Sequence, residues 1–178
     1  MNKSIRNYGI IGGLFGTVFF LGPLVINPDQ YLDPSNFENG EIVGYSVMFL
    51  SMVPVFLGTR AYRNKYFKDA PFSFAKGLIS GLKITAIATL VFYIGNVLVY
   101  EVIAPGFLEK FGVIYYDHMV ETAANEEAKA EMIAEFEAME PYVKNGFLYG
   151  IIMSASVLIF GLINSSPNFA PVVSSTFL

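Results

Sequence analysis

The sequence predicts an all-α integral membrane protein: a four-helix bundle with an additional extracytoplasmic amphipathic helical segment between the third and fourth spans. The composition favours a membrane protein, because 54% of the 178 residues are hydrophobic and 15% are charged, against about a quarter charged in ordinary soluble domains. The sequence also contains several uncharged runs that are long enough, or nearly so, to cross a hydrocarbon core about 30 Å thick as a helix. These runs cover 7–28, 42–59, 84–100 and 145–178. This length suits a single membrane domain over 1–178.

The first span is predicted over 8–26. Lys3 and Arg6 precede it, which is the charge arrangement of a signal peptide. The apolar run is longer than the usual core of a signal peptide, however, and no small-residue cleavage site follows it. We therefore expect a retained transmembrane helix that ends at the turn signal Asn27-Pro28-Asp29.

The second and third spans are predicted over 41–59 and 74–102. Pro54 lies inside the second span. Proline is tolerated in a membrane helix when neighbouring groups satisfy the freed carbonyl, and it usually produces a kink. The third span is expected to end before Pro105-Gly106, which is a turn signal.

The segment 106–142 differs from the spans because it is acidic, rich in alanine and periodic. Large side chains recur in it at spacings of three and four, as an amphipathic helix requires. They are Phe107, Phe111, Ile114, His118, Ile133, Phe136 and Met139. We expect one broken helix or a helical hairpin outside the bilayer core. The fourth span follows over 144–164, and an uncharged tail covers 165–178.

The charges predict the orientation, because positively charged flanks of membrane helices stay on the cytoplasmic side. In a four-span topology one side receives Lys3, Arg6, Arg60, Arg63, Lys65, Lys68 and Lys76, with Asp69 as its one acid. The opposite side receives nearly every carboxylate of the chain. Both termini and the uncharged tail are therefore expected in the cytoplasm.

The composition excludes several kinds of site. Without cysteine, the chain has no disulfide, thiolate zinc site, iron–sulfur cluster or cysteine nucleophile. A net charge of -4 and a pI near 5.0 argue against a nucleic-acid partner. Phosphate loops, nucleophile elbows and paired-histidine helices are missing from the sequence. We therefore expect no catalytic residue, cofactor or metal, and we interpret the single histidine, His118, as a surface or interfacial residue.

Glycines recur at a spacing of four within the predicted spans. Such pairs let helix backbones approach closely, which favours association in lipid because the hydrophobic effect does not drive helices together there. The pairs are Gly9 with Gly13, Gly12 with Gly16, Gly77 with Gly81, and Gly146 with Gly150. We favour packing within one chain over a face for self-association.

A juxtamembrane basic belt follows the second span and continues into the third. Its cations are Arg60, Arg63, Lys65, Lys68, Lys76 and Lys83. Such a belt could bind anionic lipid headgroups or a cytosolic partner, although anchoring of the topology alone explains it. Lys83 lies about two turns into the third span, where its long stem allows the ammonium group to reach back to the interface.

Four oxygen-bearing residues could converge near the outer surface: Glu41, Asn96, Glu101 and Asn145. Carboxylate and amide oxygens suit hard cations or protons, so these residues form a candidate polar or ion site. No sequence spacing fixes them relative to one another. Helix capping at the aqueous boundary is therefore the favoured interpretation.

The apolar stripe of 106–142 requires a cover, which could be the outer leaflet, the chain's own bundle or a partner protein. Helices that seek an anionic lipid surface usually present Lys and Arg, whereas the polar face here is acidic. We therefore favour docking on the bundle or on a partner.

Several segments resemble a bacterial family known as domain of unknown function 4199. The matching segments are Glu41-Ile-Val-Gly-Tyr45, Gly58-Thr-Arg-Ala-Tyr-Arg63, Phe72-Ser-Phe-Ala-Lys-Gly77 and Tyr142-Val-Lys-Asn145. The resemblance implies a small four-span protein of the bacterial inner membrane, with no assigned activity. The chain departs from the family at its end, because 165–178 carry no charge where basic residues are expected.

The leading functional hypothesis is a non-enzymatic accessory or assembly component that contacts membrane lipids and other membrane proteins, or forms a homo-oligomer. The alternative is a small oligomeric transporter or channel subunit. That alternative rests on the kink at Pro54 and on polar residues within the spans, which are Tyr45, Ser46, Ser51, Thr85, Thr89 and Asn96. An intramembrane enzyme ranks third, because no nucleophile can be named.

Overall fold

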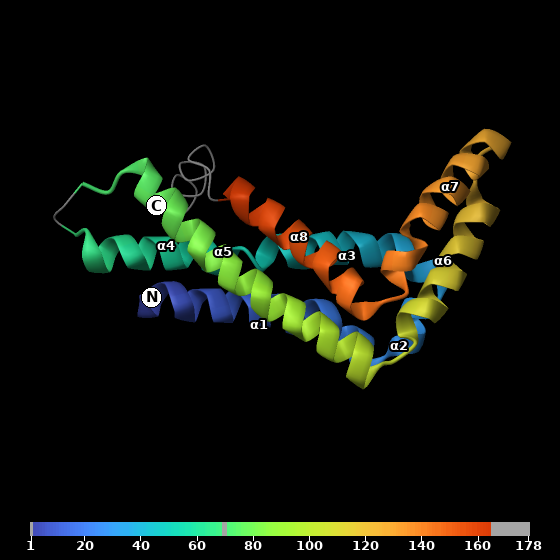
Figure 1. The fold of residues 1–178 in the computed structure, drawn as a ribbon, viewed down its shortest axis with the longest axis horizontal. Coiled ribbons are helices and arrows are strands. Elements are labelled where there is room, and N and C mark those ends of the chain that lie inside the picture. The colour runs from blue at the N-terminus through green and yellow to red at the C-terminus, as the bar shows by residue number, and fades with distance from the viewer. Residues whose placement is uncertain (1, 69–70, 165–178) are drawn as a thin grey trace.

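The computed structural model describes the backbone of residues 2–68 and 71–164, and the side chains of 2–40, 42–68 and 71–159. Over these residues the regular structure is helical and contains no strand (Figure 1). The all-α prediction is therefore confirmed for the described part of the chain. The predicted tail over 165–178 lies outside the described residues.

Helix α1 (Lys3–Ile26) contains the first predicted span. Asn2 caps its beginning, because the side-chain oxygen accepts a hydrogen bond from the Ser4 amide at 2.9 Å. Ile26 is the last helical residue. Asn27 leaves the helical conformation because Pro28 follows it, and that conformation is disfavoured for a residue before proline.

Two short helices connect α1 to the next long segment: α2 (Pro28–Leu32) and the 3₁₀-helix η1 (Pro34–Asn36). Each begins with a proline, whose fixed φ and missing amide suit the first turn of a helix. Asp33 caps η1 by accepting a hydrogen bond from the Ser35 amide at 3.0 Å. Local capping therefore orders this connection.

The second span is interrupted. Helix α3 (Phe37–Leu50) ends at Ser51, and helix α4 (Val53–Tyr66) begins two residues later. Pro54 lies in the first turn of α4, and it has no amide to bond the carbonyl four residues earlier. The Met52 amide bonds the Phe49 carbonyl at 3.1 Å, and the buried Ser51 hydroxyl donates to the Met48 carbonyl at 2.7 Å. The break thus lies just before the proline at which the kink was predicted.

Helix α5 (Phe74–Val97) begins at Ser73, whose hydroxyl accepts a hydrogen bond from the Lys76 amide. It continues into a π-helical segment, η2 (Leu98–Ile103). The chain then turns at Gly106, whose φ of 78° is a conformation that glycine adopts most easily. The third helical segment therefore ends at the predicted Pro105-Gly106 turn.

The acidic segment forms a helical hairpin, one of the two forms expected for it. Its arms are α6 (Phe107–Thr122) and α7 (Glu126–Val143). The Asn125 side chain caps α7 by accepting a hydrogen bond from the Ala128 amide at 2.8 Å. Helix α8 (Gly146–Asn164) follows, after a bend of 110° between α7 and α8.

Three described segments are long and apolar enough to cross a membrane: Lys3–Ile26, Pro34–Tyr66 and Phe74–Ile103. A fourth segment qualifies if the bent pair Glu126–Val143 and Gly146–Ile159 is taken as one span. The length and hydropathy of these helices indicate a multi-pass membrane protein.

The bundle is built around α1 and α5, which pack against each other and cross at an angle (Figure 1). Helix α4 packs on both of them, and α8 packs on α5. The largest fully buried side chains belong to this centre: Leu21, Ile84, Thr85 and Asn96. Large apolar residues such as Val18 and Leu90 are more than half exposed, which suits a surface covered by lipid.

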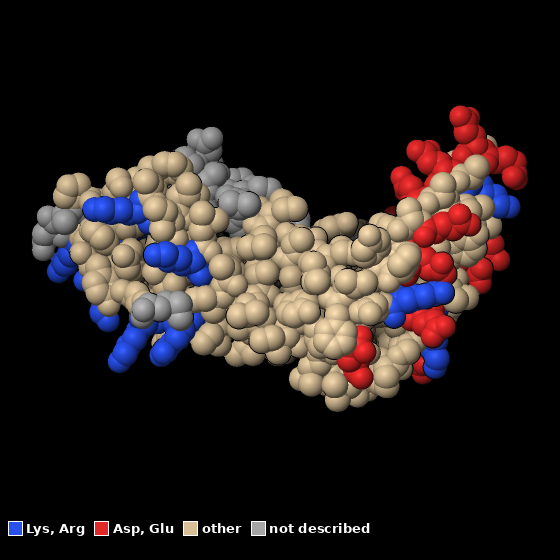
Figure 2. Space-filling model, in the orientation of Figure 1, with Lys and Arg blue, Asp and Glu red and all other residues tan. Residues whose placement is uncertain are grey.

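The two ends of the molecule carry opposite charge (Figure 2). The basic end holds the start of α1, the end of α4 and the start of α5, and it gathers the Lys and Arg residues over 3–83. The acidic end holds α2 and the α6–α7 hairpin. Residues 107–143 contain nine carboxylates and only two lysines.

Candidate functional site

Two glycines of α1 lie directly against α5. A Cβ atom added at Gly13 would lie 2.6 Å from the carbonyl oxygen of Ala88. One added at Gly9 would lie 2.6 Å from Ile87 Cβ. Real Cβ atoms essentially never approach so closely, so a larger residue at either position would push α1 away from α5. Both glycines are therefore used in packing within one chain.

The other two predicted glycines of α1, Gly12 and Gly16, lie at the interruption between α3 and α4. A Cβ atom at Gly12 would lie 3.3 Å from the Ser51 carbonyl oxygen, and one at Gly16 would lie 3.4 Å from the Phe92 ring. The space left at this crossing is about 10 Å³. That volume is at the lower limit for a single water molecule, so the centre of the bundle is nearly filled.

The remaining predicted glycines differ in their surroundings. Gly81 is buried, whereas a Cβ atom added at Gly77 would lie 3.3 Å from the Phe72 ring. A Cβ atom at Gly150 would lie 3.2 Å from the Tyr93 ring on α5, so this glycine brings α8 onto α5. Gly146, at the start of α8, lies against Glu101 and Tyr100.

Two further glycines pack as tightly but were not predicted. A Cβ atom at Gly58 would lie 2.6 Å from Tyr8 Cβ, and one at Gly95 would clash with the Thr17 side chain. Neither has a second glycine four residues away, and that spacing was the basis of the prediction. Their signal is weaker: each is a lone glycine in a helix, where it costs up to about 1 kcal/mol relative to alanine.

A row of buried polar atoms lies between α5 and α8. The Asn96 amide nitrogen donates to the Phe92 carbonyl at 2.9 Å, while the Asn96 side-chain oxygen has no described hydrogen-bond partner. The hydroxyls of Thr85, Thr89 and Ser154 are also buried and unpartnered among the described residues. Thr85, Thr89 and Asn96 share one face of α5 by their helical spacing.

The other polar residues considered for a pathway lie elsewhere. Tyr45 is 63% exposed on α3, and the exposed Ser46 hydroxyl donates to the Ile42 carbonyl at 2.8 Å. The Ser51 hydroxyl is satisfied within its own helix turn. These three residues therefore do not join the row on α5. Ser51 lines the small space beside Gly12 and Gly16, and the three α5 residues do not.

The outer oxygens are brought together only in part. The Glu101 carboxylate accepts a hydrogen bond from the Gly146 amide at 2.8 Å. The Asn145 side-chain oxygen accepts from the amides of Phe147 at 2.9 Å and Leu148 at 3.1 Å. Both side chains therefore cap the start of α8, where the free amides of a helix favour acceptors.

Asn96 does not take part in this cap. Asn96 is fully buried, and its Cβ lies 3.5 Å from the Cβ position at Gly150, one helical turn beyond the cap. The side chain of Glu41 lies outside the described residues. Nowhere in the described residues do three His, Asp or Glu side chains gather at a spacing that could hold a metal ion.

His118 lies on α6 at the junction between the hairpin and the bundle. Its ring meets the Phe37 ring edge-on, with 5.3 Å between the centroids. Phe37 is buried and also contacts Phe111 and Tyr115, each at 5.5 Å. One face of α6 therefore packs on Phe37, at the start of α3, and these contacts cover part of the apolar stripe.

The basic end combines cations with aromatic rings. The Lys76 ammonium nitrogen lies 4.5 Å from the centre of the Phe67 ring, and that of Lys65 lies 5.5 Å from the Tyr66 ring. Phe67 also packs against Phe72, with 5.3 Å between the centroids. The predicted belt residues Arg60, Arg63, Lys65, Lys68, Lys76 and Lys83 are all exposed. The structure thus leaves these cations free to reach headgroups or solvent.

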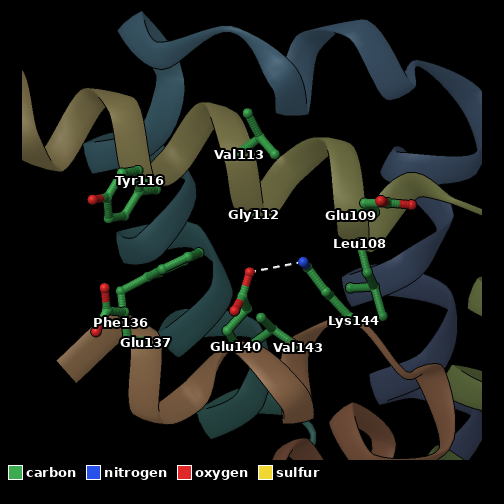
Figure 3. A pocket seen from close by; sticks show the side chains of 10 residues that line it. All are labelled: Leu108, Glu109, Gly112, Val113, Tyr116, Phe136, Glu137, Glu140, Val143 and Lys144. Atoms are coloured by element: carbon green, nitrogen blue, oxygen red, sulfur yellow. Dashed lines mark ion pairs between the residues drawn. The ribbon is translucent and has the colours of Figure 1, made fainter. Parts of the chain in front are cut away.

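The hairpin carries a groove of about 270 Å³ between α6 and α7 (Figure 3). Its walls are built from Leu108, Glu109, Gly112, Val113 and Tyr116 of α6, and from Phe136, Glu137, Glu140, Val143 and Lys144 at the end of α7. Tyr116 and Phe136 meet at one end, with 4.9 Å between their ring centroids. Glu140 and Lys144 form an ion pair of 2.7 Å within it.

The apolar stripe of this segment was predicted from the sequence, but the groove was not. The groove depends on Gly112, which is buried in α6 and lacks the side chain that would fill the space. A lone glycine inside an otherwise regular helical pattern was the available signal. This glycine opens a groove only because α7 packs opposite it, and no local sequence pattern predicts where α7 lies.

Two titratable groups in the connection between α1 and α3 have shifted pKa values. Hydrogen bonds from the Ser35 hydroxyl and amide lower the pKa of Asp33 below its ordinary value. Partial burial raises the pKa of Tyr31. The Tyr31 shift reflects its packing on the cluster that contains Leu24, Tyr100 and Phe107, so it marks where the connection meets the hairpin.

Similarity to known proteins identifies a family but no activity. No curated protein and no solved structure is significantly similar to this chain. Residues 7–168 match a family described as protein of unknown function (DUF4199). The match covers nearly the whole chain and includes every helix of the bundle and of the hairpin. The resemblance found in the sequence is thereby confirmed, and the chain belongs to the DUF4199 family.

Proposed function

We propose that this chain is a non-enzymatic accessory or assembly component of the bacterial inner membrane, which acts by contacting other membrane proteins. The single observation that carries the proposal is the nearly filled bundle, which leaves about 10 Å³ at its centre. A transported solute or a substrate needs a pathway or a chamber, and the described residues where α1 crosses the interruption between α3 and α4 leave room for neither. Surfaces therefore remain as the means of action, above all the acidic hairpin.

In this proposal the chain spans the membrane four times, with α8 as the fourth span and both termini in the cytoplasm. The segregation of charge supports this orientation, because the basic end holds the cations that favour the cytoplasmic side (Figure 2). The hairpin then lies outside the cytoplasm. The exposed apolar faces of α1 and α5 contact membrane lipids, and a homo-oligomer could form on the same faces.

A small oligomeric transporter or channel subunit remains the second candidate, and one observation favours it. Thr85, Thr89, Asn96 and Ser154 leave four polar atoms buried without a described partner. Buried polar groups are normally satisfied, and in membrane proteins they often mark a pathway. For transport, a second copy would have to open this row to water.

The testing experiment is a mass measurement of the protein taken directly from its native membrane into nanodiscs, with mass spectrometry of what co-purifies. A stoichiometric membrane-protein partner is the expected result. A pure homo-oligomer that conducts ions or solutes in liposomes would overturn the accessory role in favour of transport.

The orientation has its own test, which the lack of native cysteines makes direct. Single cysteines replace Asn64, at the exposed end of α4, and Ala124, at the exposed tip of the hairpin. A membrane-impermeant maleimide added to whole cells with a permeable outer membrane should label Ala124→Cys and spare Asn64→Cys until the cells are lysed. The reverse pattern would contradict the proposed topology.

A further inference from the structure

We propose that the groove between α6 and α7 is a docking site for a cationic amphipathic helix of a partner membrane protein. This inference rests on the proposed accessory function and adds the location of the contact and the chemistry of the partner. It is carried by the shape of the groove, its apolar lining, and the sign of the charge around it.

The groove offers both chemical parts that an amphipathic helix requires. Its lining includes apolar and aromatic side chains. Tyr116 and Phe136 are in contact at one end of the groove, and Leu108 lies at the other end (Figure 3). A cavity of about 270 Å³ accommodates a few side chains but not a whole helix. It therefore suits a partner that lies along the groove and inserts anchors at helical spacing, as in other helix-in-groove complexes.

Gly112 keeps the groove open. A Cβ atom at this position would lie 3.8 Å from the end of the Phe136 ring, which is an ordinary van der Waals distance. The position thus tolerates alanine without strain, and the missing side chain is not required for the two helices to pack. Glycine in a helix interior is unfavourable relative to alanine by up to about 1 kcal/mol. The groove is therefore maintained against local helix preference.

The charges fix the sign of the partner. Glu109, Glu137 and Glu140 line the groove, and Lys144 pairs with Glu140 at 2.7 Å. The other two carboxylates form no ion pair among the described residues, so the groove keeps a net negative charge. The rest of the hairpin is acidic as well (Figure 2). A cationic helix would therefore be attracted to the groove, and complementary charge favours both its approach and its orientation.

Other occupants fit these observations less well. A second copy of the chain in the same orientation presents most of its cations at the opposite end of the molecule (Figure 2). Anionic lipid headgroups are repelled by the carboxylates. The chain's own aromatic stripe is already used on the other side of α6, where Phe111 and Tyr115 contact Phe37.

The test uses the full chain in nanodiscs of phosphatidylcholine, a zwitterionic lipid that attracts cationic peptides weakly. The probe is a fluorescent amphipathic Leu/Lys peptide of about five helical turns, and its binding is followed by anisotropy against empty nanodiscs. A Leu/Glu peptide with the same apolar pattern is the control probe. We expect binding of the Leu/Lys peptide that weakens with salt, and no comparable binding of the Leu/Glu peptide.

Two sets of variants locate the binding. Gly112→Leu fills the groove and should weaken the Leu/Lys peptide at least tenfold, with Gly112→Ala causing a smaller loss. Glu109→Gln with Glu137→Gln removes two groove charges without changing its volume, so it tests the site even if the leucine variant fails to fold. Its matched control is Glu131→Gln with Glu135→Gln, which removes the same charge from exposed positions of α7 that do not line the groove.

Three results would overturn the inference: no binding of the Leu/Lys peptide, equal binding of the Leu/Glu peptide, or equal losses from the two double variants. Co-purification separates these failures from failure of the proposed function. A stoichiometric partner that is captured equally by the wild type and by Gly112→Leu would keep the accessory role and reject the groove. The absence of any partner from the wild type would reject the accessory role itself.

Discussion

The bundle and the α6–α7 hairpin both depend on glycine, but they use it in opposite ways. In the bundle, Gly9 and Gly13 remove the side chains between α1 and α5, so the two backbones touch. In the hairpin, Gly112 leaves a groove between α6 and α7, and the two arms meet at one end of it through the rings of Tyr116 and Phe136. The same residue therefore closes an interface in one region and opens a groove in the other.

The difference follows from what drives each pair of helices together. Helices in lipid gain little from the hydrophobic effect, so they depend on close contact of many atoms. Helices that face water gain from burying a few large rings and can leave space between them. A substitution that adds volume should consequently be severe in the bundle and mild in the hairpin.

The largest effect is expected from Gly13→Leu. The added side chain would meet the Ala88 carbonyl and Val91, and both belong to a helix that cannot move without disturbing α8. Overpacking typically costs 1–3 kcal/mol, and a clash with backbone places this variant at about 3 kcal/mol or beyond. Thermal unfolding in detergent should show the loss.

The control is Gly22→Leu on the same helix, because no atom lies within 4 Å of a Cβ atom built there. We expect it to unfold near the wild-type temperature. Equal stability of the two variants would mean that α1 does not pack on α5 through its glycines.

A smaller and local effect is expected from Phe37→Ala, which tests the joint between the two regions. Phe37 is buried and contacts Phe111, Tyr115 and His118. Its truncation should cost about 3 kcal/mol, mostly by releasing α6 from the bundle. Hydrogen exchange should therefore speed up in α6 and stay unchanged in α1 and α5.

Phe49→Ala is the matched control, since Phe49 lies on the same helix and is half exposed. It should leave the exchange of α6 as it is. Faster exchange throughout the bundle in Phe37→Ala would show that the hairpin and the bundle form one cooperative unit.

Thr85→Val should act in the opposite direction. The Thr85 hydroxyl is fully buried and has no described partner, so replacing it by a methyl group should raise the free energy of unfolding by about 1 kcal/mol. Thr17→Val is the comparison, because the Thr17 hydroxyl donates to the Gly13 carbonyl at 2.8 Å and its removal should bring no gain. A clear loss of stability in Thr85→Val would reveal a bound water or ion and would favour the transport hypothesis.

The smallest effect concerns pH and the connection before α3. Hydrogen bonds from Ser35 lower the pKa of Asp33 in the folded chain. This carboxylate therefore adds stability above its unfolded pKa of about 4, and the contribution is lost as the pH falls through the lower folded value. Ser35→Ala should raise the pKa of Asp33 toward its ordinary value in an NMR titration.

Ser46→Ala provides the control for that titration, because the Ser46 hydroxyl donates to the Ile42 carbonyl, away from Asp33. It should leave the pKa of Asp33 unchanged. An equally low pKa of Asp33 in Ser35→Ala would mean that the hydroxyl bond does not set it.

The helical class and the turns at Pro28 and Pro105-Gly106 could be predicted, because they depend on local composition and backbone preference. The ends of the helices could not: α3 begins at Phe37 and α4 runs on to Tyr66, on either side of the span predicted over 41–59. Hydropathy registers the lipid-facing part of a helix, whereas capping and aromatic contacts extend helices past it.

Contacts between distant segments explain the rest of what was missed. Gly58 and Gly95 resemble any other glycine until Tyr8 and Thr17 are placed opposite them. Glu101 was predicted to be near Asn145 at the outer surface, but its bond to the Gly146 amide joins residues 45 positions apart. Such pairs need the crossing of the helices, which the sequence pattern of one helix does not contain.

The bond between Glu101 and the Gly146 amide has a consequence for how the chain can vary. It holds the end of η2 against the start of α8, so the hairpin leaves the bundle and returns to it at a single point. Lengthening or shortening the arms beyond that point changes the cost of closing the loop only slowly. The distal part of the hairpin, beyond the contacts with Phe37, could thus change in length while η2 stays joined to α8.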